Sequence, residues 1–570
     1  MTKKDAVHAL GVTADLLELL DENAFRVAAY RRAERNLDRF DGDWDAVLGA
    51  HFKGVQGIGA QLGAALVELD ATGLFPPLVE AASQAPAGVL ELFRVRGLGP
   101  KKARALWLAG IESLADLRAA IERGEVAGIK GFGVATQARL RDEVEFALRS
   151  AERRLPPETE QAFAELQSLL AGAAWRVEAA GSLRRGCETN GDLDAVVVGE
   201  VEAIRAALNG VLHPQWPWVV QADVLGVPVE AAVVSQEAFG AALLLMTGSQ
   251  AFREQVQDPA LERRGLSWAG GSLRRADGAL VATPEERDAF EALDLSFTPP
   301  EWREAEHLGI QVPDPAEWAT REDLRGLVHV HSTWSDGAES IASLAKAAQN
   351  AGYSYLGLSD HSRSAFYAGG LSIERLREQG REVDDLNAAL NGFRVLKGIE
   401  CDILADGGLD YPDDVLSSLD FVIASVHGHF ELSQSDQTAR LIRAASHPLV
   451  TIMGHLTGRL LLQRPAYALD QDAVLEAACT CGTAVEINAN PHRLDLDWRV
   501  ALRWRERGLL SAICPDAHRT SGFSDVRYGL ALARKAGLRR AQIVNTLSAE
   551  AFLANALAKR PGGSHALSEP

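Results

Sequence analysis

The spacing of hydrophobic positions changes twice along the chain. Through about residue 150, apolar residues recur at the three- and four-residue intervals of amphipathic helices, as in 6–17 and 62–69, which predicts an all-α region. Between about 160 and 240, a helix precedes β-type runs such as Ala195-Val-Val-Val, which predicts an α+β region. From Leu327 onward, apolar strands alternate with helical stretches. We therefore expect three regions built in different ways.

The alternating third region predicts a barrel. Its apolar strands end near residues 331, 359, 400, 426, 454, 487 and 514, with helical stretches between several of them. Strands that alternate with helices form parallel sheets with helical crossovers. The pattern therefore predicts an α/β fold, a distorted barrel of about seven strands.

Composition favours a soluble intracellular protein. Hydrophobic residues make up 47% and charged residues 24% of the chain, and the longest apolar runs fall short of the roughly 18 residues of a membrane span. The first residues lack the apolar stretch of a signal peptide. The 5 cysteines are odd in number and scattered, as expected of reduced thiols. We expect a cytoplasmic, nucleoid-associated protein that does not bind a membrane.

The net charge of −20 is unusual for a protein that binds nucleic acid. Residues 1–150 hold 19 Lys+Arg against 21 Asp+Glu, a balance of −2, so the remaining balance of −18 lies downstream. Phosphate contacts are made locally, whereas the total charge bears on solubility and steering. The negative total therefore does not exclude DNA as a partner.

Three copies of a Gly-apolar-Gly turn lie in the helical region, each followed by a helical run. They are Gly57-Ile-Gly59, Gly97-Leu-Gly99 and Gly131-Phe-Gly133, the second followed by Lys101 and Lys102. Glycines at a helix N-terminus let a phosphate approach the backbone N–H groups closely. The repeats predict helix-hairpin-helix motifs that hold a DNA backbone without reading bases. Helix caps in an all-α domain are the alternative.

A second motif lies at the start of the α+β region. Asp192 and Asp194 stand two apart on a predicted strand, so both carboxylates project from one face. Paired carboxylates beside nucleotide phosphates suit Mg²⁺ or Mn²⁺. Upstream, the turn at Gly181 and Ser182 can cradle phosphate, and Arg185 adds positive charge. A solvated turn before a strand is the alternative.

This stretch resembles the nucleotidyltransferase fold of family X DNA polymerases, and with Thr247-Gly-Ser249 the resemblance spans residues 1 to about 315. The resemblance implies partners, namely dNTPs and DNA that is gapped, nicked or 3′-ended. It also implies site residues. The catalytic carboxylates would be Asp192, Asp194 and Glu230, and the nucleotide-binding residues would be Gly181, Ser182, Arg185, Gly191, Thr247 and Gly248.

The sequence departs from that family in three places. Glu230 stands where the third catalytic Asp is expected, Leu245-Met246 replaces an aromatic pair, and Arg253 replaces an Asn. The longer Glu side chain moves its oxygens, and a misplacement of about 1 Å can cost roughly 10²-fold in rate. We therefore expect a polymerase activity that is weak, altered in its metal preference or absent.

Histidines and acids gather at the ends of the predicted barrel strands. The C-terminal strand ends of such barrels converge on one face, where active sites form. Imidazoles and carboxylates without thiolates fit Mn²⁺, Zn²⁺ or Fe. A lone histidine on an apolar strand is usually a core residue, but this alternative fits a set of this size poorly. The candidate ligands are His329, His331, Asp336, His361, Glu400, His427, His455, Asp516 and His518.

This pattern resembles the PHP (polymerase and histidinol phosphatase) domain over about 323–560. The resemblance implies up to three divalent ions, with Arg459 on the substrate phosphate. It places one ion on His329, His331, Glu400 and Asp516. A second lies on Asp336, His361 and His518, and a third on Glu400, His427 and His455. This chain is similar to proteins in which such a domain is fused to such a polymerase. That resemblance implies a Mn²⁺-dependent 3′–5′ exonuclease activity.

Taken together, these patterns predict a multidomain DNA-repair enzyme that fills gaps and trims 3′ ends. A 3′-phosphatase or abasic-site endonuclease that uses the same cluster is an alternative. A DNA-end scaffold with a decayed polymerase site and a small-molecule phosphatase are the others. The oligomeric state is not predicted.

The expected domains follow from the breaks at Pro156-Pro157 and Thr298-Pro-Pro together with the resemblance. They are an N-terminal helical DNA-end-binding domain (1–85), fingers (86–155), a palm (156–240), a thumb (241–298), a linker (299–322), the PHP domain (323–560) and a disordered tail (561–570).

Overall fold

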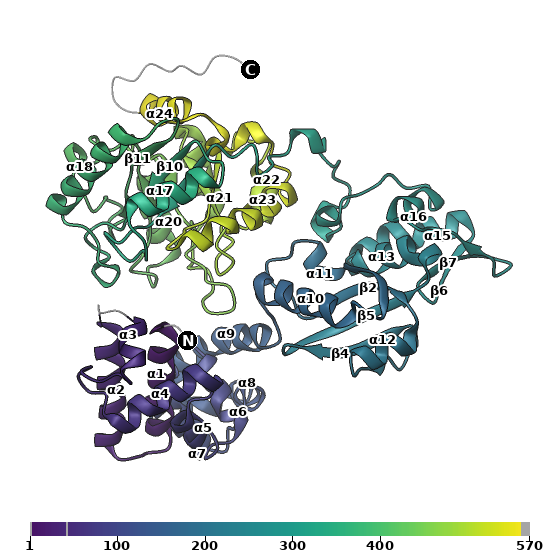
Figure 1. Ribbon diagram of the computed structural model, residues 1–570, viewed down its shortest axis with the longest axis horizontal. Helices are drawn as coiled ribbons and strands as arrows, with labels where there is room; N and C mark the ends of the chain where they lie inside the picture. The colour runs from purple at the N-terminus through teal and green to yellow at the C-terminus, as the bar shows by residue number, and fades with distance from the viewer. Residues whose placement is uncertain (1–2, 41–43, 560–570) are drawn as a thin grey trace. The chain divides into compact units, whose positions relative to one another are not determined.

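A computed structural model describes residues 3–40 and 44–559, and the chain divides into two compact units, Met1–Glu152 and Arg153–Pro570 (Figure 1). The tail expected over 561–570 lies outside the described residues.

The first unit is helical and has two cores. One core gathers around Phe52, Leu66 and Phe75, and the other around Leu106 and Leu140. Its helices are α1 (Lys3–Leu19), α2 (Ala24–Asp38), α3 (Trp44–Gly49), α4 (Ala60–Thr72), α5 (Pro76–Ala82), α6 (Ala87–Glu91), α7 (Pro100–Leu108), α8 (Leu114–Glu122) and α9 (Val134–Ala151).

The second unit opens with a five-stranded mixed sheet in the order β1-β2-β5-β4-β3. Strands β2 and β5 are parallel, and Asp194 is opposite Glu230 in their register. The sheet carries the candidate carboxylates on its central strands. Its elements are α10 (Pro156–Leu170), β1 (Ala174–Ala179), α11 (Gly181–Arg184), β2 (Leu193–Gly199), α12 (Val201–Ala207), β3 (Val211–Leu212), β4 (Val219–Val224) and β5 (Val227–Val234).

A helical layer with a small antiparallel sheet follows, and its core gathers around Leu244, Phe252 and Phe290. Its elements are α13 (Phe239–Thr247), α14 (Gln250–Phe252), α15 (Asp258–Arg264), β6 (Leu266–Ala269), β7 (Ser272–Arg275), β8 (Leu280–Val281) and α16 (Glu286–Ala292).

The segment 299–322, expected as a linker, packs against the barrel that follows it. It forms short 3-10 turns, and Trp302 and Arg303 within it are buried. The ring of His307 stacks between Trp302 and Trp498, at centroid distances of 4.4 and 4.8 Å. The Trp302 indole N–H donates to the carbonyl oxygen of Arg534 at 2.9 Å.

The remaining residues form the barrel, whose strands pair in parallel in two sheets, β11-β10-β9 and β12-β13-β14-β15-β16. Helices such as α17, α18, α20 and α21 lie outside the strands (Figure 1). The strands are β9 (Gly326–Val330), β10 (Tyr355–Leu358), β11 (Arg394–Lys397), β12 (Glu400–Asp402), β13 (Ile423–Ser425), β14 (Ile452–Met453), β15 (Ala484–Asn488) and β16 (Ser511–Cys514). The helices are α17 (Ile341–Asn350), α18 (Ile373–Ala389), α19 (Asp413–Leu416), α20 (Gln434–Ala445), α21 (Gln471–Cys481), α22 (Trp498–Trp504), α23 (Val526–Lys535) and α24 (Ala549–Ala558).

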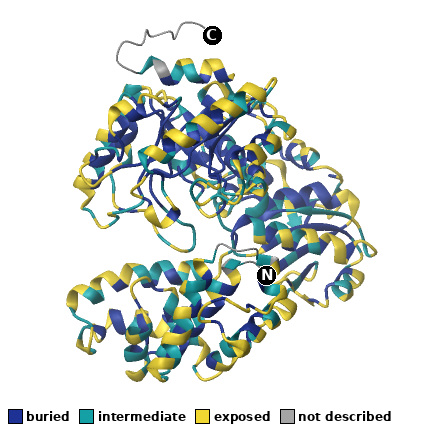
Figure 2. Ribbon diagram, turned by 60° about the vertical axis from the view of Figure 1, so that its left-hand side comes forward, coloured by how far each residue is buried: buried dark blue, intermediate teal, exposed yellow. Residues whose placement is uncertain are grey.

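Two isolated bridges join the two sheets into a ring. Val330 pairs with Ala517, and His361 pairs with Glu400, both in parallel. Buried residues concentrate on the strands, and exposed residues lie along the outer faces of the helices (Figure 2). The expected multidomain class is confirmed, with a helical region, an α+β region and an α/β barrel.

In the described part of the chain, a single helix long and apolar enough to cross a membrane is not found. Helices α4 and α5 pass a length and composition test only as a pair, with a bend of 90° between them.

Candidate active sites

The three Gly-apolar-Gly turns of the first unit share one backbone pattern. The apolar residue between the glycines donates its N–H to the carbonyl three positions earlier, as Leu98 does to Val95 at 3.0 Å. Ile58 and Phe132 make the same bond, at 3.1 and 3.0 Å. The second glycine of each turn is the N-cap of the next helix and has no side-chain cap. Each turn therefore presents uncapped N–H groups, the arrangement that favours a phosphate.

The first glycine of each turn has a positive φ: +88° at Gly57, +85° at Gly97 and +94° at Gly131. Side chains rarely adopt this conformation, which explains why glycine stands there. At the second glycines, Gly59, Gly99 and Gly133, a Cβ atom would meet nothing within 4 Å. Neither the backbone conformation nor the packing requires glycine at these positions. The space beside them is therefore open to a ligand.

The two lysines after the second turn differ in their surroundings. Lys101 has a side chain that is 86% exposed and lies 3.7 Å from Glu18. Lys102 donates to the carbonyl oxygen of Gly97 at 3.3 Å. Lys101 is thus the freer of the two to reach a phosphate.

Three carboxylates of the mixed sheet lie together: Asp192, just before β2, Asp194 on β2, and Glu230 on β5. Burial raises the pKa of Asp194 to about 7, and Asp192 and Glu230 add to the rise. Gln221, opposite Glu230 on β4, donates to its Oε1 at 2.9 Å. Carboxylates that disfavour one another's charge are a donor set suited to a cation.

A cavity of about 570 Å³ opens beside these carboxylates. Gly181 begins α11 against Asp194, and a Cβ atom at Gly181 would overlap that carboxylate. The cavity's lining residues include Gly181, Ser182, Arg185, Asp192, Asp194, Glu230, Gly248, Trp216, Trp218 and Trp268. The tryptophans supply rings that sequence reasoning did not identify.

The expected nucleotide-binding residues also have partners within the protein. Ser182 donates to Asn190 Oδ1 at 2.9 Å. Arg185 donates to the Thr247 carbonyl at 2.9 Å and to Glu304 at 3.0 Å. Thr247 is fully buried, and Gly191 lies in the turn before β2. Arg185 is therefore held by neighbouring groups at the edge of the cavity.

The barrel brings all nine candidate ligands together, with Glu400 at the centre. Its Oε1 lies 3.3 Å from His329 Nε2, 3.3 Å from His427 Nε2 and 2.9 Å from His455 Nε2. Its Oε2 lies 2.9 Å from His361 Nδ1. A single carboxylate within reach of four imidazoles has the geometry of a bridging ligand.

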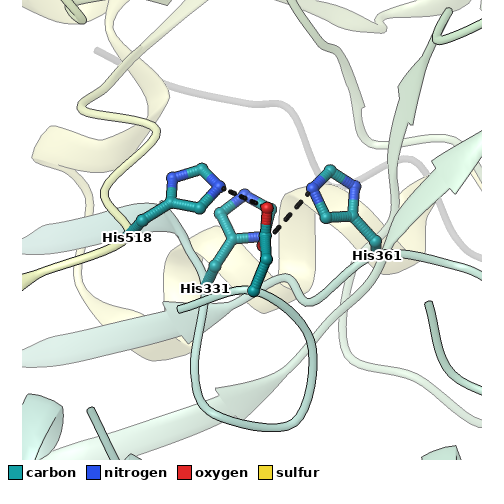
Figure 3. A group of neighbouring side chains, drawn as sticks. His331, His361 and His518 are labelled. Carbon is teal, nitrogen blue, oxygen red and sulfur yellow. Dashed lines mark ion pairs between the residues drawn. The ribbon is translucent and has the colours of Figure 1, made fainter. Parts of the chain in front are cut away.

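Two further groups flank Glu400. Asp516 Oδ1 lies 3.3 Å from His331 Nε2. Asp336 lies 3.6 Å from His361 Nε2 and 3.3 Å from His518 Nε2, and three imidazoles surround one carboxylate in this group (Figure 3). The ligand atoms of each group lie within 4.8 Å of one another, a spacing that can hold a metal ion.

Two ligands have an unusual backbone. His329 has a φ of +67° and Asp516 a φ of +51°, and the register of β9 against β10 shifts at His329. Residues other than glycine pay about 1–2 kcal/mol for such a conformation, and strain of this kind gathers at functional sites. The bulge, rather than simple strand alternation, sets where His329 points.

Buried groups outside the predicted set orient the ligands. Glu486 Oε1 pairs closely with His329 Nδ1, and Asp402 Oδ1 lies 2.6 Å from His427 Nδ1. Asn488 donates to Asp516 at 3.1 Å. Such partners fix the tautomer and orientation of metal-ligating histidines. Glu486 carries a sequence signal, because a charge within the apolar run Ala484–Asn488 must be paired.

Burial and the neighbouring charges set the pKa values of the acids and imidazoles. Burial lowers the pKa of His331 to about 3, and the neighbouring histidines add to this. Burial also opposes protonation of His427, but Glu400 and the hydrogen bond with Asp402 raise its pKa to about 10. The surrounding imidazoles hold the pKa of Glu400 well below its usual range despite burial. Glu400 is therefore an anion, as a carboxylate that binds a cation would be.

The donor set fits divalent cations. Buried nitrogens of His329, His331, His361 and His455 have no hydrogen-bond partner among the described residues. Burying polar atoms without hydrogen-bond partners costs free energy. A site that brings such atoms together with three carboxylates is suited to bind a cation.

The two arginines near this centre have different partners. Arg459, expected on the substrate phosphate, donates to the carbonyl oxygens of Arg493 and Leu494 and to Asp497. Arg493 Nε lies 3.2 Å from Asp516 Oδ2. Arg493 is therefore the arginine whose guanidinium contacts a candidate ligand.

Comparisons with known families match four segments of the chain. Helix-hairpin-helix families match residues 1–75 and 89–145. The DNA polymerase beta thumb family matches 242–304, and the PHP domain family matches 328–489.

Similar proteins match either nearly the whole chain or a part of it. The chain is 33% identical to the DNA polymerase/3′-5′ exonuclease PolX of Bacillus subtilis, covering 97% of this chain and 99% of that protein. It is 28% identical over 219 residues to a probable phosphatase of Thermoanaerobacter sp. strain X514, covering 35% of this chain and 86% of that protein. A probable phosphatase of Caldanaerobacter subterraneus is 34% identical over 23% of this chain and 52% of its own length.

Proposed function

This chain belongs to the PolX family of DNA polymerases and 3′-5′ exonucleases, and from that premise we propose how its residues divide the two activities. The barrel removes nucleotides from a DNA 3′ end with divalent ions, preferably Mn²⁺. The mixed sheet extends a primer in gapped or nicked DNA, using dNTPs and Mg²⁺ or Mn²⁺. We place both activities in the cytoplasm, on nucleoid DNA.

The convergence of nine ligands at one end of the barrel carries the proposal for the nuclease. Divalent ions held by these residues would lower the pKa of water and place positive charge beside the phosphate. Water adds to phosphorus, the bond to the 3′ oxygen breaks, that oxygen takes a proton, and a nucleoside 5′-monophosphate leaves. Glu400 holds ligands together, while Glu486 and Asp402 fix the imidazoles of His329 and His427.

We assign the substrate-phosphate contact to Arg493 rather than to Arg459, the arginine expected there. Arg493 lies against Asp516 and has fewer backbone partners, so its guanidinium can exchange that contact for a phosphate oxygen. Arg459 instead ties together the loop that carries Arg493. Its removal would displace the loop rather than remove a direct contact.

The nuclease is tested with a 5′-labelled single-stranded oligonucleotide and Mn²⁺. The wild type should give a ladder of stepwise shortened products. His331→Ala or Asp516→Ala should lower the rate at least about 100-fold, because each removes a candidate ligand. DNA binding should be retained, because the hairpins lie elsewhere in the chain. Nuclease activity that survives both substitutions would refute the assignment to the barrel.

A 3′-phosphatase or abasic-site endonuclease is the second candidate, favoured by the similarity of part of this chain to probable phosphatases. An oligonucleotide with a 3′-phosphate separates the two. Phosphatase action releases inorganic phosphate and leaves the strand length unchanged, whereas exonuclease action shortens the strand.

The polymerase is proposed to be weak. Glu230 takes the place of the expected Asp, although it is paired with Asp194 in register and held by Gln221. Primer extension on gapped DNA tests this site: the wild type should extend the primer slowly, and Asp192→Ala should not extend it. Equal primer extension by the two proteins would show that these carboxylates take no part in the reaction. If neither protein extends the primer, this part of the chain would be a DNA-end scaffold.

A further inference from the structure

A short turn in the barrel exposes two large aromatic side chains next to one another. The 3-10 turn Phe366–Ala368 follows the ligand His361 by a few residues. Phe366 is 85% exposed and Tyr367 is 64% exposed. Their ring centroids lie 6.0 Å apart in an edge-to-face arrangement. Two adjacent exposed rings form a small apolar surface, which is unfavourable in water unless something covers it.

The turn is held firmly at its base. Leu371 donates its N–H to the carbonyl oxygen of His361 at 2.9 Å, which closes the loop. Arg363 and Ser364 both donate to the buried carboxylate of Asp410, at 3.0 and 2.8 Å. Within the loop, Ala365 is fully buried. The turn that carries the rings is therefore anchored. The exposure of the rings does not result from a loop without contacts.

The far side of the turn is tied to the loop that carries another ligand. Arg375 donates to the carbonyl oxygens of Gly369 and Trp334, at 3.0 and 2.6 Å. A Cβ atom at Gly369 would lie 3.4 Å from the carbonyl oxygen of Ser335, the residue before Asp336. The turn thus stands between the segments that carry His361 and Asp336.

The charges around Tyr367 include carboxylates of the candidate metal centre. Local desolvation raises the pKa of Tyr367, and the carboxylates of Asp402, Glu400 and Asp336 raise it further. Arg493 acts in the opposite direction. These charged groups belong to the candidate centre, so Tyr367 lies within electrostatic range of it, while 64% of the residue stays exposed.

We propose that Phe366 and Tyr367 form a stacking platform for the terminal bases of a single-stranded DNA 3′ end. This rests on the nuclease function proposed above. A base has an apolar face whatever its identity, so stacking grips any sequence, as a nuclease that trims ends requires. A terminal base held on the rim brings its own 5′ phosphate to the ligands, whereas a base that remains paired in a duplex is not free to stack there.

The test compares Phe366→Ala with the wild type on two 5′-labelled oligonucleotides in Mn²⁺. One ends in an ordinary nucleotide and the other in a residue that lacks a base. Wild type should cut the ordinary end about 10-fold faster or more, the value expected for one stacked base. Phe366→Ala should cut both ends at the slower rate, and Phe366→Trp should restore the preference. Tyr367→Phe should keep it, because the ring remains.

Two controls make each outcome decisive. Trp175→Ala removes an aromatic side chain that is 78% exposed on β1 of the mixed sheet, and it should leave both rates unchanged. Metal content of each variant, measured on the purified protein, should match the wild type. A wild type without nuclease activity would refute the proposed function. An active wild type whose preference is the same in Phe366→Ala would refute the platform alone.

Discussion

Glu486 shows how much of the candidate metal centre depends on a residue outside the predicted ligand set. Its carboxylate is fully buried on β15, where one oxygen pairs with His329 Nδ1 and the other accepts the backbone N–H of His455. It therefore connects two ligands from different strands. Removing its charge should loosen both.

We predict that Glu486→Gln lowers metal affinity about 10- to 100-fold, the usual effect of losing such an orienting partner. Isothermal titration of the metal-free protein with Mn²⁺ measures this. Glu476→Gln, on the exposed face of α21, is the matched control and should leave the affinity unchanged. An unaltered affinity in Glu486→Gln would show that the backbone alone orients these histidines.

The gathering of the nine candidate ligands could be expected from sequence because histidines and acids recur at strand ends, but their geometry could not. Regular strand alternation would put His329 and His331 on one face, whereas a positive φ at His329 breaks that regularity. Asp402 and Asn488 were missed because a polar residue within an apolar strand does not reveal its partner. Which arginine faces the centre depends on loop conformation, which sequence spacing does not encode.

Among the elements, each of the three hairpin turns has two glycines with different roles. The first is needed for its backbone conformation, and the second leaves room for a phosphate to approach the helix. Gly131 has a positive φ and Gly133 does not, while a Cβ atom at either position would meet nothing within 4 Å. We predict that Gly131→Ala lowers the free energy of unfolding by about 1–2 kcal/mol through backbone strain. Gly133→Ala should leave it unchanged, which urea denaturation measures.

DNA binding should respond in the opposite order. Gly133→Ala places a methyl group where a phosphate would approach the start of α9, so affinity for duplex DNA should fall several-fold, measured by fluorescence anisotropy at fixed salt. If Gly133→Ala binds DNA as tightly as the wild type, this turn is only a helix cap.

Element boundaries in the barrel were predictable from sequence to within a few residues. Strands expected to end near 359, 454 and 514 end at Leu358, Met453 and Cys514. Apolar runs between helical segments mark buried parallel strands clearly. The separation of β11 from β12 was not expected, although Lys397 and Gly398 interrupt the apolar residues before Glu400.

For the molecule as a whole, His307 links folding to pH. It is 4% exposed, stacked between two tryptophans, and its Nε2–H donates to the Lys535 carbonyl. Burial lowers the pKa of His307 to about 4. The unfolded chain, with an ordinary histidine pKa near 6.5, therefore binds more protons than the folded protein between these values. Stability is kept above pH 6.5 and lost as pH falls toward 4.

We predict that this histidine alone lowers the free energy of unfolding by about 2 kcal/mol between pH 7 and pH 5. Other groups titrate in this range, so the comparison is between wild type and His307→Gln, which cannot take up the proton. The variant should be less stable at pH 7 but should lose about 2 kcal/mol less on acidification. Parallel pH profiles for the two proteins would contradict the prediction.

The bridge between Val330 and Ala517 joins the first barrel strand to the segment after the last, and ligands stand on both sides of it. His329 and His331 are made early in translation of the barrel, while Asp516 and His518 are made nearly two hundred residues later. A nascent chain on the ribosome would therefore complete its mixed sheet long before the candidate ligands of the barrel meet. On the proposed division of activities, newly made protein would be able to extend DNA ends before it could degrade them.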